Sequence, residues 1–186
     1  MSTLFSPLGL LPAYSQSGIV RPGPRMQIAS GYATNIFQGY PIQFDANGFV
    51  TAAAAATRAG GVFQGVEYTD ANGKRTYSNK WLANTVATDI WAWVTFDFSY
   101  QTLYQIQCNA TVTLAAIGQQ YDWEALSGNT TTGLATMGLN VASAAANDGL
   151  QVVGLVPGPD NDWGDPFPVV LVRLSEQQFV ADVAGF

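Results

Sequence analysis

Short runs of alternating apolar and polar residues, separated by turn residues, recur along the chain from residue 26 onward. The clearest pair, 40–44 and 49–51, flanks the sequence Asp45-Ala-Asn-Gly48, whose Asn-Gly pair favours the positive φ angles of a tight hairpin. A second turn of the same composition begins at Asp70, after the predicted strand 62–68 and before 74–77. The pattern therefore predicts antiparallel hairpins.

Other strands are predicted from apolar runs rich in β-branched and aromatic residues. Residues 90–98 have the composition of a central strand. Further strands are predicted at 103–108, 133–139, 150–156 and 169–174. Helix is expected only as about one turn near 99–103 and as a closing segment at 175–183, capped by Ser175. The sequence thus predicts an all-β fold, a sandwich or small barrel with an extended N-terminal arm and little helix.

Residues 1–30 differ from the β-rich body predicted at 31–186. Four prolines and three glycines in this stretch interrupt any regular element. Its apolar side chains are too many for a freely solvated tail: Leu4, Phe5, Leu8, Leu10, Leu11 and Tyr14. We expect an extended arm that buries these side chains, either against its own body or against a neighbouring subunit.

The composition points to a protein that is held by other proteins. Hydrophobic residues make up 48% of the 186 residues and charged residues only 11%, well below the roughly 25% that is typical of soluble domains. The surface must then consist largely of uncharged polar and small apolar groups, and such a surface is adhesive. The alternative is a secreted domain that its uncharged polar groups merely keep soluble.

The charge balance disfavours nucleic acid and membranes as partners. The net charge is −6 and no basic run is longer than Lys74-Arg75, so a groove that follows phosphates is not expected. No segment approaches the roughly 20 apolar residues that a membrane span needs. The N-terminal residues lack a charged stretch followed by an apolar one, so export by a signal peptide is not expected. Up to residue 44 the chain carries Arg21 and Arg25 but no acid, so this segment could dock onto an acidic partner.

The absence of histidine excludes the catalytic relays and metal sites that need an imidazole. Two carboxylate pairs remain for glycosidase-type chemistry, Asp89 with Asp97 and Asp122 with Glu124. The second pair flanks Trp123 at strand spacing, which would aim both carboxylates to one face, or it lies in a solvated loop. We expect neither an enzyme nor a cofactor.

Metal binding is not expected either. The loop 160–165 (Asp-Asn-Asp-Trp-Gly-Asp) has oxygen side chains at alternate positions, but it lacks the bidentate Glu of a calcium loop. Asp and Asn also gather in loops because they cap backbone turns. Cys108 is the single cysteine, which excludes an intrachain disulfide and predicts a small buried thiol.

The tryptophan side chains have two possible roles, in binding or in the core. Trp91 and Trp93 share one face of a predicted strand, where they form either a sugar-stacking platform or core. Trp81 and Trp163 lie in turn-rich stretches and are expected to be exposed, as residues of a protein interface.

Three stretches between about residues 30 and 175 resemble a family of tailed-phage virion proteins, the capsid decoration (cement) or minor structural proteins. The first contains Gly39-Tyr-Pro-Ile, Ala46-Asn-Gly-Phe-Val and residues 62–75, with Ser78 and Trp81. The second is Ile117-Gly-Gln-Gln-Tyr-Asp with residues 128–136, and the third is Leu150-Gln-Val-Val-Gly-Leu with Asn161, Gly164-Asp165 and 169–172. Family members often end with a histidine after the last strand, and this chain has none.

The resemblance implies a structural protein on the outside of the filled head, made in the host cytoplasm. Such proteins are small oligomers, often trimers, that bridge subunits of the major capsid protein and stabilise the shell. Another virion component, such as a head fibre base or a tail-associated protein, and a carbohydrate-binding β module are the alternatives. The interface is expected to include Leu4, Phe5, Leu8, Leu10, Leu11, Tyr14, Arg21, Arg25, Trp81 and Trp163.

Overall fold

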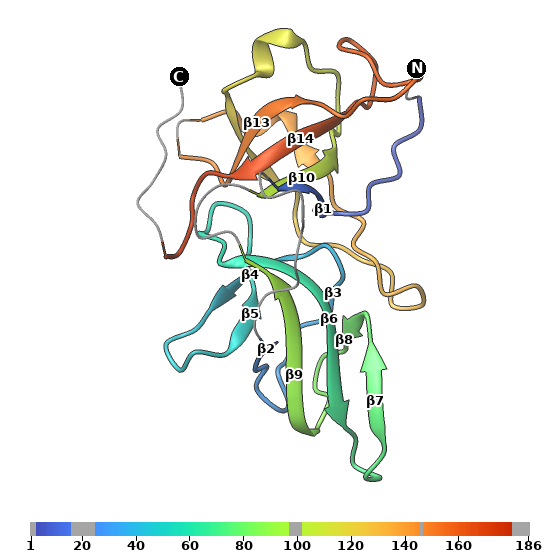
Figure 1. The fold of residues 1–186 in the computed structure, drawn as a ribbon, viewed down its shortest axis with the longest axis vertical. Coiled ribbons are helices and arrows are strands. Elements are labelled where there is room, and N and C mark those ends of the chain that lie inside the picture. The colour runs from blue at the N-terminus through green and yellow to red at the C-terminus, as the bar shows by residue number, and fades with distance from the viewer. Residues whose placement is uncertain (1–2, 16–24, 97–101, 146, 180–186) are drawn as a thin grey trace.

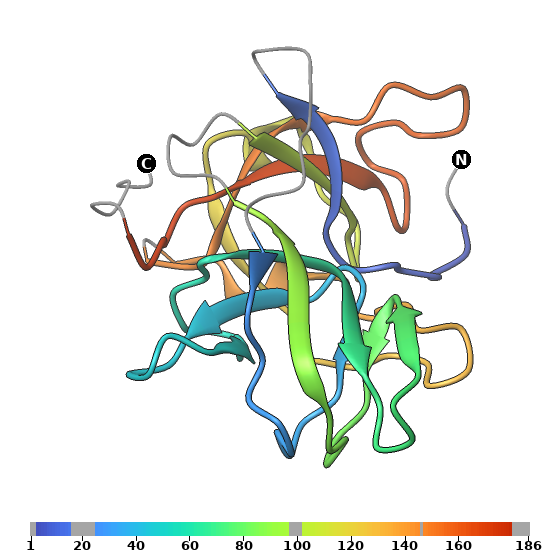
Figure 2. The same cartoon turned by 60° about the horizontal axis from the view of Figure 1, so that its bottom comes forward.

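The computed structural model describes residues 3–15, 25–96, 102–145 and 147–179. Two six-stranded antiparallel sheets form separate layers, one above the other in Figure 1 and again in the turned view of Figure 2. A two-stranded sheet lies beside the lower layer. The described residues contain no α-helix and only two short 3₁₀ turns, Leu114–Ala116 and Val141–Ser143. The predicted all-β fold with little helix is confirmed, and its layers are those of a sandwich.

The upper sheet contains both the first and the last strand of the described chain. In spatial order its strands are β1 (Leu11–Ser15), β10 (Thr102–Gln107), β14 (Val169–Leu174), β13 (Leu150–Leu155), β11 (Gln120–Trp123) and β12 (Leu139–Asn140). Buried and half-buried residues alternate strictly along β10 and β14. One face of the sheet therefore packs on the core while the other is partly open to solvent.

The lower sheet is built around two long central strands. Its path is β2 (Arg25–Met26), β9 (Thr88–Thr95), β6 (Gly61–Thr69), β4 (Pro41–Phe44) and β5 (Val50–Ala52), and β7 (Arg75–Ser78) also pairs with β6. The small sheet pairs β3 (Ile36–Phe37) with β8 (Lys80–Trp81). The loop that follows β11 reaches this small sheet, where Asn79 Nδ2 donates to the carbonyl of Thr132 at 2.8 Å.

Two turns of identical sequence close the hairpins β4–β5 and β6–β7. Asp45 Oδ1 accepts from the backbone N–H groups of Asn47 and Phe49 at 2.8 and 2.9 Å. Asp70 repeats this arrangement, accepting from Asn72 and Lys74 at 2.9 Å each. Glycine alone takes the positive φ in each turn, +80° at the first and +77° at the second, so the expectation that Asn would share it was wrong. The aspartate side chain stabilises each turn instead, through its hydrogen bonds to the two backbone N–H groups.

Most predicted strands are confirmed, and two segments were assigned wrongly. Of residues 133–139 only Leu139 lies in a strand, β12, while Leu134 and Ala135 make isolated bridges, because the chain here crosses from one layer to the other. The described part of 175–183 is not helical: Gln177 bridges to Ala59, and Ser175 is buried with its hydroxyl bonded to the carbonyl of Asp148. Residues 99–101 and 180–183 lie outside the described residues, and Leu103 belongs to β10.

A single buried apolar cluster joins the two layers. Its largest fully buried side chains include Trp81, Trp123, Tyr104 and Phe63. The expected exposure of Trp81 was wrong: the side chain is 0% exposed and meets the Tyr68 ring edge-on, with 5.6 Å between centroids. Although its neighbours are turn residues, Trp81 lies in β8, and its pairing with Ile36 of β3 directs the indole inward.

The described part of the N-terminal segment packs against its own body. Leu10 is fully buried in the core, so its expected place in an interface was wrong, because β1 continues the upper sheet by pairing with β10. Gln107 holds the residues before it: its side chain accepts from the N–H of Ser6 and donates to the carbonyl of Leu4, both at 2.8 Å. Phe5 packs on Phe167 with ring centroids 5.5 Å apart.

Candidate functional site

The outer side of β1, β10 and β14 carries aliphatic side chains, amides and one cation, Arg173, whose guanidinium donates to Gln151 Oε1. We call it the aliphatic face and define it as Leu11, Leu103, Gln105, Gln107, Val169 and Leu171. The register aligns Leu11 with Gln105 and Gln105 with Leu171 across three neighbouring strands. All six residues are half-buried, whereas the residues between them in β10 and β14 are buried. A half-open face of this composition suits contact with another apolar surface.

The N-terminal segment extends this face with exposed apolar side chains. Leu4 is 75% exposed and Leu8 43% exposed, while Pro7 between them is buried. A cavity of about 170 Å³ lies between the segment and the face, lined by Leu8, Leu11 and Val169 among others. Tyr14 pairs with Leu103 in the register and is also exposed. Segment and sheet together thus form one apolar surface.

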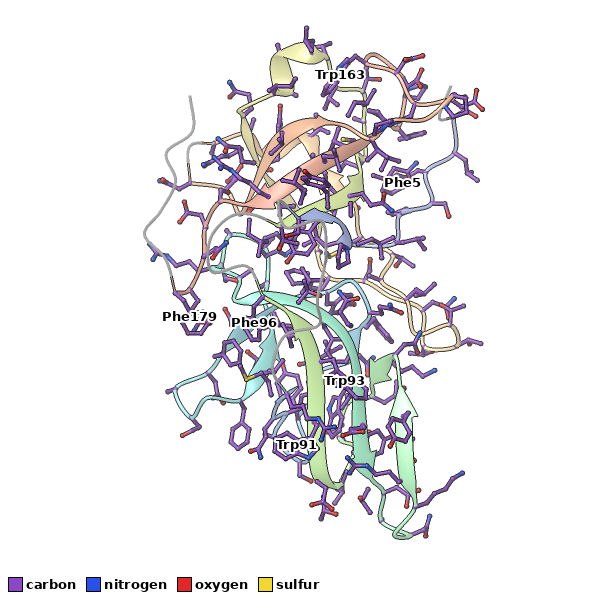
Figure 3. The ribbon with its side chains drawn as sticks, viewed as in Figure 1. Phe5, Trp91, Trp93, Phe96, Trp163 and Phe179 are labelled. Atoms are coloured by element: carbon purple, nitrogen blue, oxygen red, sulfur yellow. The ribbon has the colours of Figure 1, made fainter. Side chains whose placement is uncertain are left out.

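The lower sheet has a very different outer face. We call it the tryptophan face and define it as Arg25, Glu67, Arg75, Tyr77, Trp91 and Trp93, on four neighbouring strands. Register places Arg25 opposite Trp93, Glu67 opposite both Tyr77 and Trp91, and Arg75 opposite Thr69. Figure 3 shows Trp91 and Trp93 side by side along β9. Alternation along the strands places these side chains on one side of the sheet.

The interpretation of Trp91 and Trp93 as core residues was wrong. Both are half-buried, whereas Ala92 and Val94 point inward and are fully buried. The Trp93 ring is nearly parallel to the Tyr77 ring, at 10° with centroids 6.3 Å apart. Tyr77 itself is 68% exposed. The indoles therefore cover the outside of the sheet, and the core below them is made of small side chains.

One buried carboxylate orders the charges of the tryptophan face. Glu67 is 4% exposed, and its Oε1 lies 2.9 Å from Arg75 Nη2 and 3.4 Å from Arg25 Nη1. Arg75 Nη1 also donates to the carbonyl of Asp89 at 2.9 Å. Arg25 remains largely exposed. Two guanidinium groups thus lie beside aromatic rings, Arg75 held by two close contacts and Arg25 by a single longer one.

The other expected interface residues divide between surface and interior. Leu4, Leu8, Tyr14 and Arg25 are exposed, and Phe5, Leu11 and Trp163 are half-buried. Trp163 packs against the core from the loop above the upper sheet (Figure 3), so it is less exposed than expected. Arg21 lies outside the described residues.

An apolar groove of about 530 Å³ lies beside the hairpin β4–β5, lined by Phe44, Phe96 and Phe179 among others. The ring of Phe44 stacks on that of Phe96 at 5.7 Å and contacts Phe179 at 5.4 Å, and Figure 3 shows the last two residues close together. Gln178 fixes the site, because its amide pairs with both the N–H and the carbonyl of Phe44, at 2.8 and 2.7 Å. No local sequence pattern indicates this cluster, because its members are far apart along the chain.

The candidate catalytic carboxylates take part in structural hydrogen bonds. Asp122 is buried in β11 and accepts from the N–H of Gly149 at 3.0 Å, so the solvated-loop reading was wrong for it. Glu124 accepts from the N–H of Gly138 at 2.8 Å and from Asn109 Nδ2 at 3.1 Å. Burial, and then the nearby Asp122 charge, raise the pKa of Asp148. Asp97, the partner proposed for Asp89, lies outside the described residues.

The acidic loop at 160–165 caps its own turns. Asp165 Oδ2 accepts from the N–H of Asp162 at 3.0 Å. Asn161 Nδ2 donates to the carbonyls of Val156 and Val169, at 2.8 Å each. Within the described ranges no group of three or more acidic, cysteine or histidine side chains could hold a metal ion.

The buried thiol predicted at Cys108 is confirmed. Its side chain is fully buried, and burial raises the pKa of the thiol to about 12.

The helices of the described residues include none with the length and hydropathy of a membrane span.

Comparisons with known proteins add no relative. We compared the chain with models of protein families, with curated proteins and with solved structures, and none of the three comparisons found a match.

Proposed function

We propose that this chain is a structural virion protein that decorates the outside of a tailed-phage capsid and stabilises it by bridging subunits of the major capsid protein. The aliphatic face, extended by Leu4 and Leu8, is the observation on which the proposal rests. It combines a large half-open apolar surface with a single cation beside it, Arg173, which is already bonded to Gln151, and protein interfaces bury surfaces that are poor in charge. The sequence resemblance to capsid decoration proteins points to the same role.

The physical basis of decoration is preferential binding to the assembled shell. A protein that binds the expanded lattice but not its separated subunits shifts the equilibrium away from rupture. Each copy needs only modest affinity if the protein is an oligomer, because linked copies bind with a raised effective concentration. We propose a trimer for this reason, with the aliphatic face toward the capsid.

Charge introduced into the aliphatic face tests the proposal. Leu8→Lys and Leu171→Lys each place an ammonium group on a surface that would be desolvated by the capsid, which is costly without a partner charge. We expect either variant to reduce co-sedimentation with emptied, expanded heads of the parent phage by at least about tenfold. Val86→Lys is the matched control, because Val86 is exposed in the loop between β8 and β9.

Three outcomes separate the alternatives. Loss of binding in both face variants but not in the control supports capsid docking through this face. Equal binding by all variants contradicts it. If the chain binds purified tails or head fibres but not heads, the same face serves another virion component instead.

A further inference from the structure

We propose that the tryptophan face is a glycan-binding site, separate from the face that docks on the capsid. The site would take pyranose sugars, with their C–H faces on the aromatic rings and their hydroxyls on the guanidinium groups. The inference goes beyond the proposed function, because the two faces belong to different sheets (Figure 1) and either could bind without the other.

A glycine on β6 leaves room for the aromatic part of the site. Gly65 lies opposite Trp93 in the register, and a Cβ at this position would lie 3.6 Å from the indole and 3.1 Å from the carbonyl of Ser78. With no side chain on β6 at this point, Trp93 reaches across that strand to stack with Tyr77 of β7. Trp91 adds a third ring two residues along β9. The outer side of the sheet thus carries two nearly parallel rings, Trp93 and Tyr77, with Trp91 next to Trp93 along the strand.

Flat rings of this kind bind sugars for a defined reason. The face of an aromatic ring carries partial negative charge, and the axial C–H bonds of a pyranose carry partial positive charge. Parallel rings allow consecutive contacts along an extended sugar chain. The rings are also ordered before any ligand arrives, since Trp93 and Tyr77 already pack on each other, so binding loses little side-chain entropy.

The polar part of the site supplies directional hydrogen bonds. Arg25 is exposed and retains N–H groups beyond the one that faces Glu67, and its strand pairs it directly with Trp93. The buried carboxylate of Glu67 pairs with both arginines, at 2.9 Å from Arg75 Nη2 and 3.4 Å from Arg25 Nη1. Planar groups fixed beside aromatic rings match the pairs of neighbouring hydroxyls at a pyranose edge. A surface meant only for apolar protein contact would not require buried acid to position two cations.

Electrophoresis of the native full-length chain through gels that contain a soluble polysaccharide tests the inference. The probes are hydroxyethylcellulose, dextran and alginate, which present β-linked, α-linked and acidic pyranoses. We expect retardation by at least one of the three. Tyr77→Ala should weaken it about three- to tenfold, because the exposed ring is lost without disturbing the core. Tyr77→Phe keeps the ring and should bind like the parent chain.

Tyr14→Ala is the matched control, because it removes another exposed tyrosine ring, 53% exposed against 68% for Tyr77, from the other sheet. Unchanged retardation in this control, with loss in Tyr77→Ala, supports the site. The inference is overturned if none of the three polysaccharides retards the parent chain, or if Tyr77→Ala is retarded as strongly as its control. If Tyr77→Ala instead abolishes co-sedimentation with heads, the tryptophan face is a protein interface and the glycan assignment is wrong.

Discussion

The two large sheets have similar inner faces and dissimilar outer faces. Inward, both contribute apolar side chains to one core, such as Val170 and Val172 above and Ala92 and Val94 below. Outward, the upper sheet offers leucine, valine and glutamine with one arginine, Arg173, while the lower sheet offers tryptophan, tyrosine and two arginines. The inner faces are therefore explained by folding alone, and the difference between the outer faces shows where binding is to be expected.

The two outer faces differ in what they can recognise. Aliphatic side chains lose water on contact with any complementary apolar surface, so they contribute area more than direction. Aromatic rings and paired guanidinium groups have fixed planes, so they select the orientation of what they contact. This contrast motivates a broad protein contact for the upper sheet and a small oriented ligand for the lower one.

The largest effect on stability is expected in the N-terminal segment, where two leucines, one buried and one exposed, have opposite roles. Leu10→Ala should lower the free energy of unfolding by about 2–5 kcal/mol, because it opens a cavity in the core. Leu4→Ala should change it by less than about 0.5 kcal/mol, since that side chain is exposed. Urea denaturation of both variants measures the difference. Equal effects would mean that the N-terminal segment is not anchored as described.

The next effect concerns the aromatic rings on the outer side of the lower sheet. Gly65→Val places branched methyl groups against the carbonyl of Ser78 and under the Trp93 ring, so we expect a loss of about 1–3 kcal/mol from overpacking. The displaced indole should also abolish polysaccharide retardation, while binding to heads persists because the aliphatic face is untouched. Loss of both activities together would contradict the separation of the two faces.

A smaller effect is expected from the glutamine that holds the N-terminal segment. Gln107→Ala removes the hydrogen bonds to Ser6 and Leu4 and should cost about 1 kcal/mol. The segment before Leu10 should then be cut faster by a protease under native conditions. Gln105→Ala changes the same face without touching these bonds and serves as the control. If both variants are cut at the parent rate, Gln107 does not hold the segment.

The smallest effect is a pH-dependent change at Asp148. Burial and the Asp122 charge raise the pKa of this group above its ordinary value of 3.8, so the fold favours the protonated form. That contribution to stability is complete below pH 3.8 and is lost as the pH rises through the raised value. Asp148→Asn keeps an acceptor for the N–H of Ala145 but carries no charge. It should therefore raise the Tm at pH 7 and leave it unchanged at pH 3.

Local chemistry predicted much of this fold. The repeated Asp-Ala-Asn-Gly turns and the β-branched runs located both hairpins and the long strands, because these signals act over a few residues. Short strands such as β3, β8 and β11 were missed, since their pairing depends on partners far along the chain. Trp81 was placed outside for the same reason: turn residues around it say nothing about the direction of its side chain.

The candidate surfaces were predictable only in part. The shared face of Trp91 and Trp93 follows from strand spacing, and the hairpin register would also have brought Tyr77 opposite Glu67. The space above Gly65 and the pairing of Arg25 with Trp93 could not be foreseen, because β2 joins the sheet from a distant part of the sequence. The aliphatic face likewise needs β1, β10 and β14 to be neighbours, which no local pattern indicates.

Amide hydrogen exchange of the chain, free and bound to emptied phage heads, tests the central claim most directly. Docking through the aliphatic face predicts slower exchange in residues 3–15, β10 and β14, with no change in β7 and β9. Slower exchange confined to β7 and β9, or no change in any described strand at full occupancy, would contradict the assignment of the aliphatic face to capsid docking.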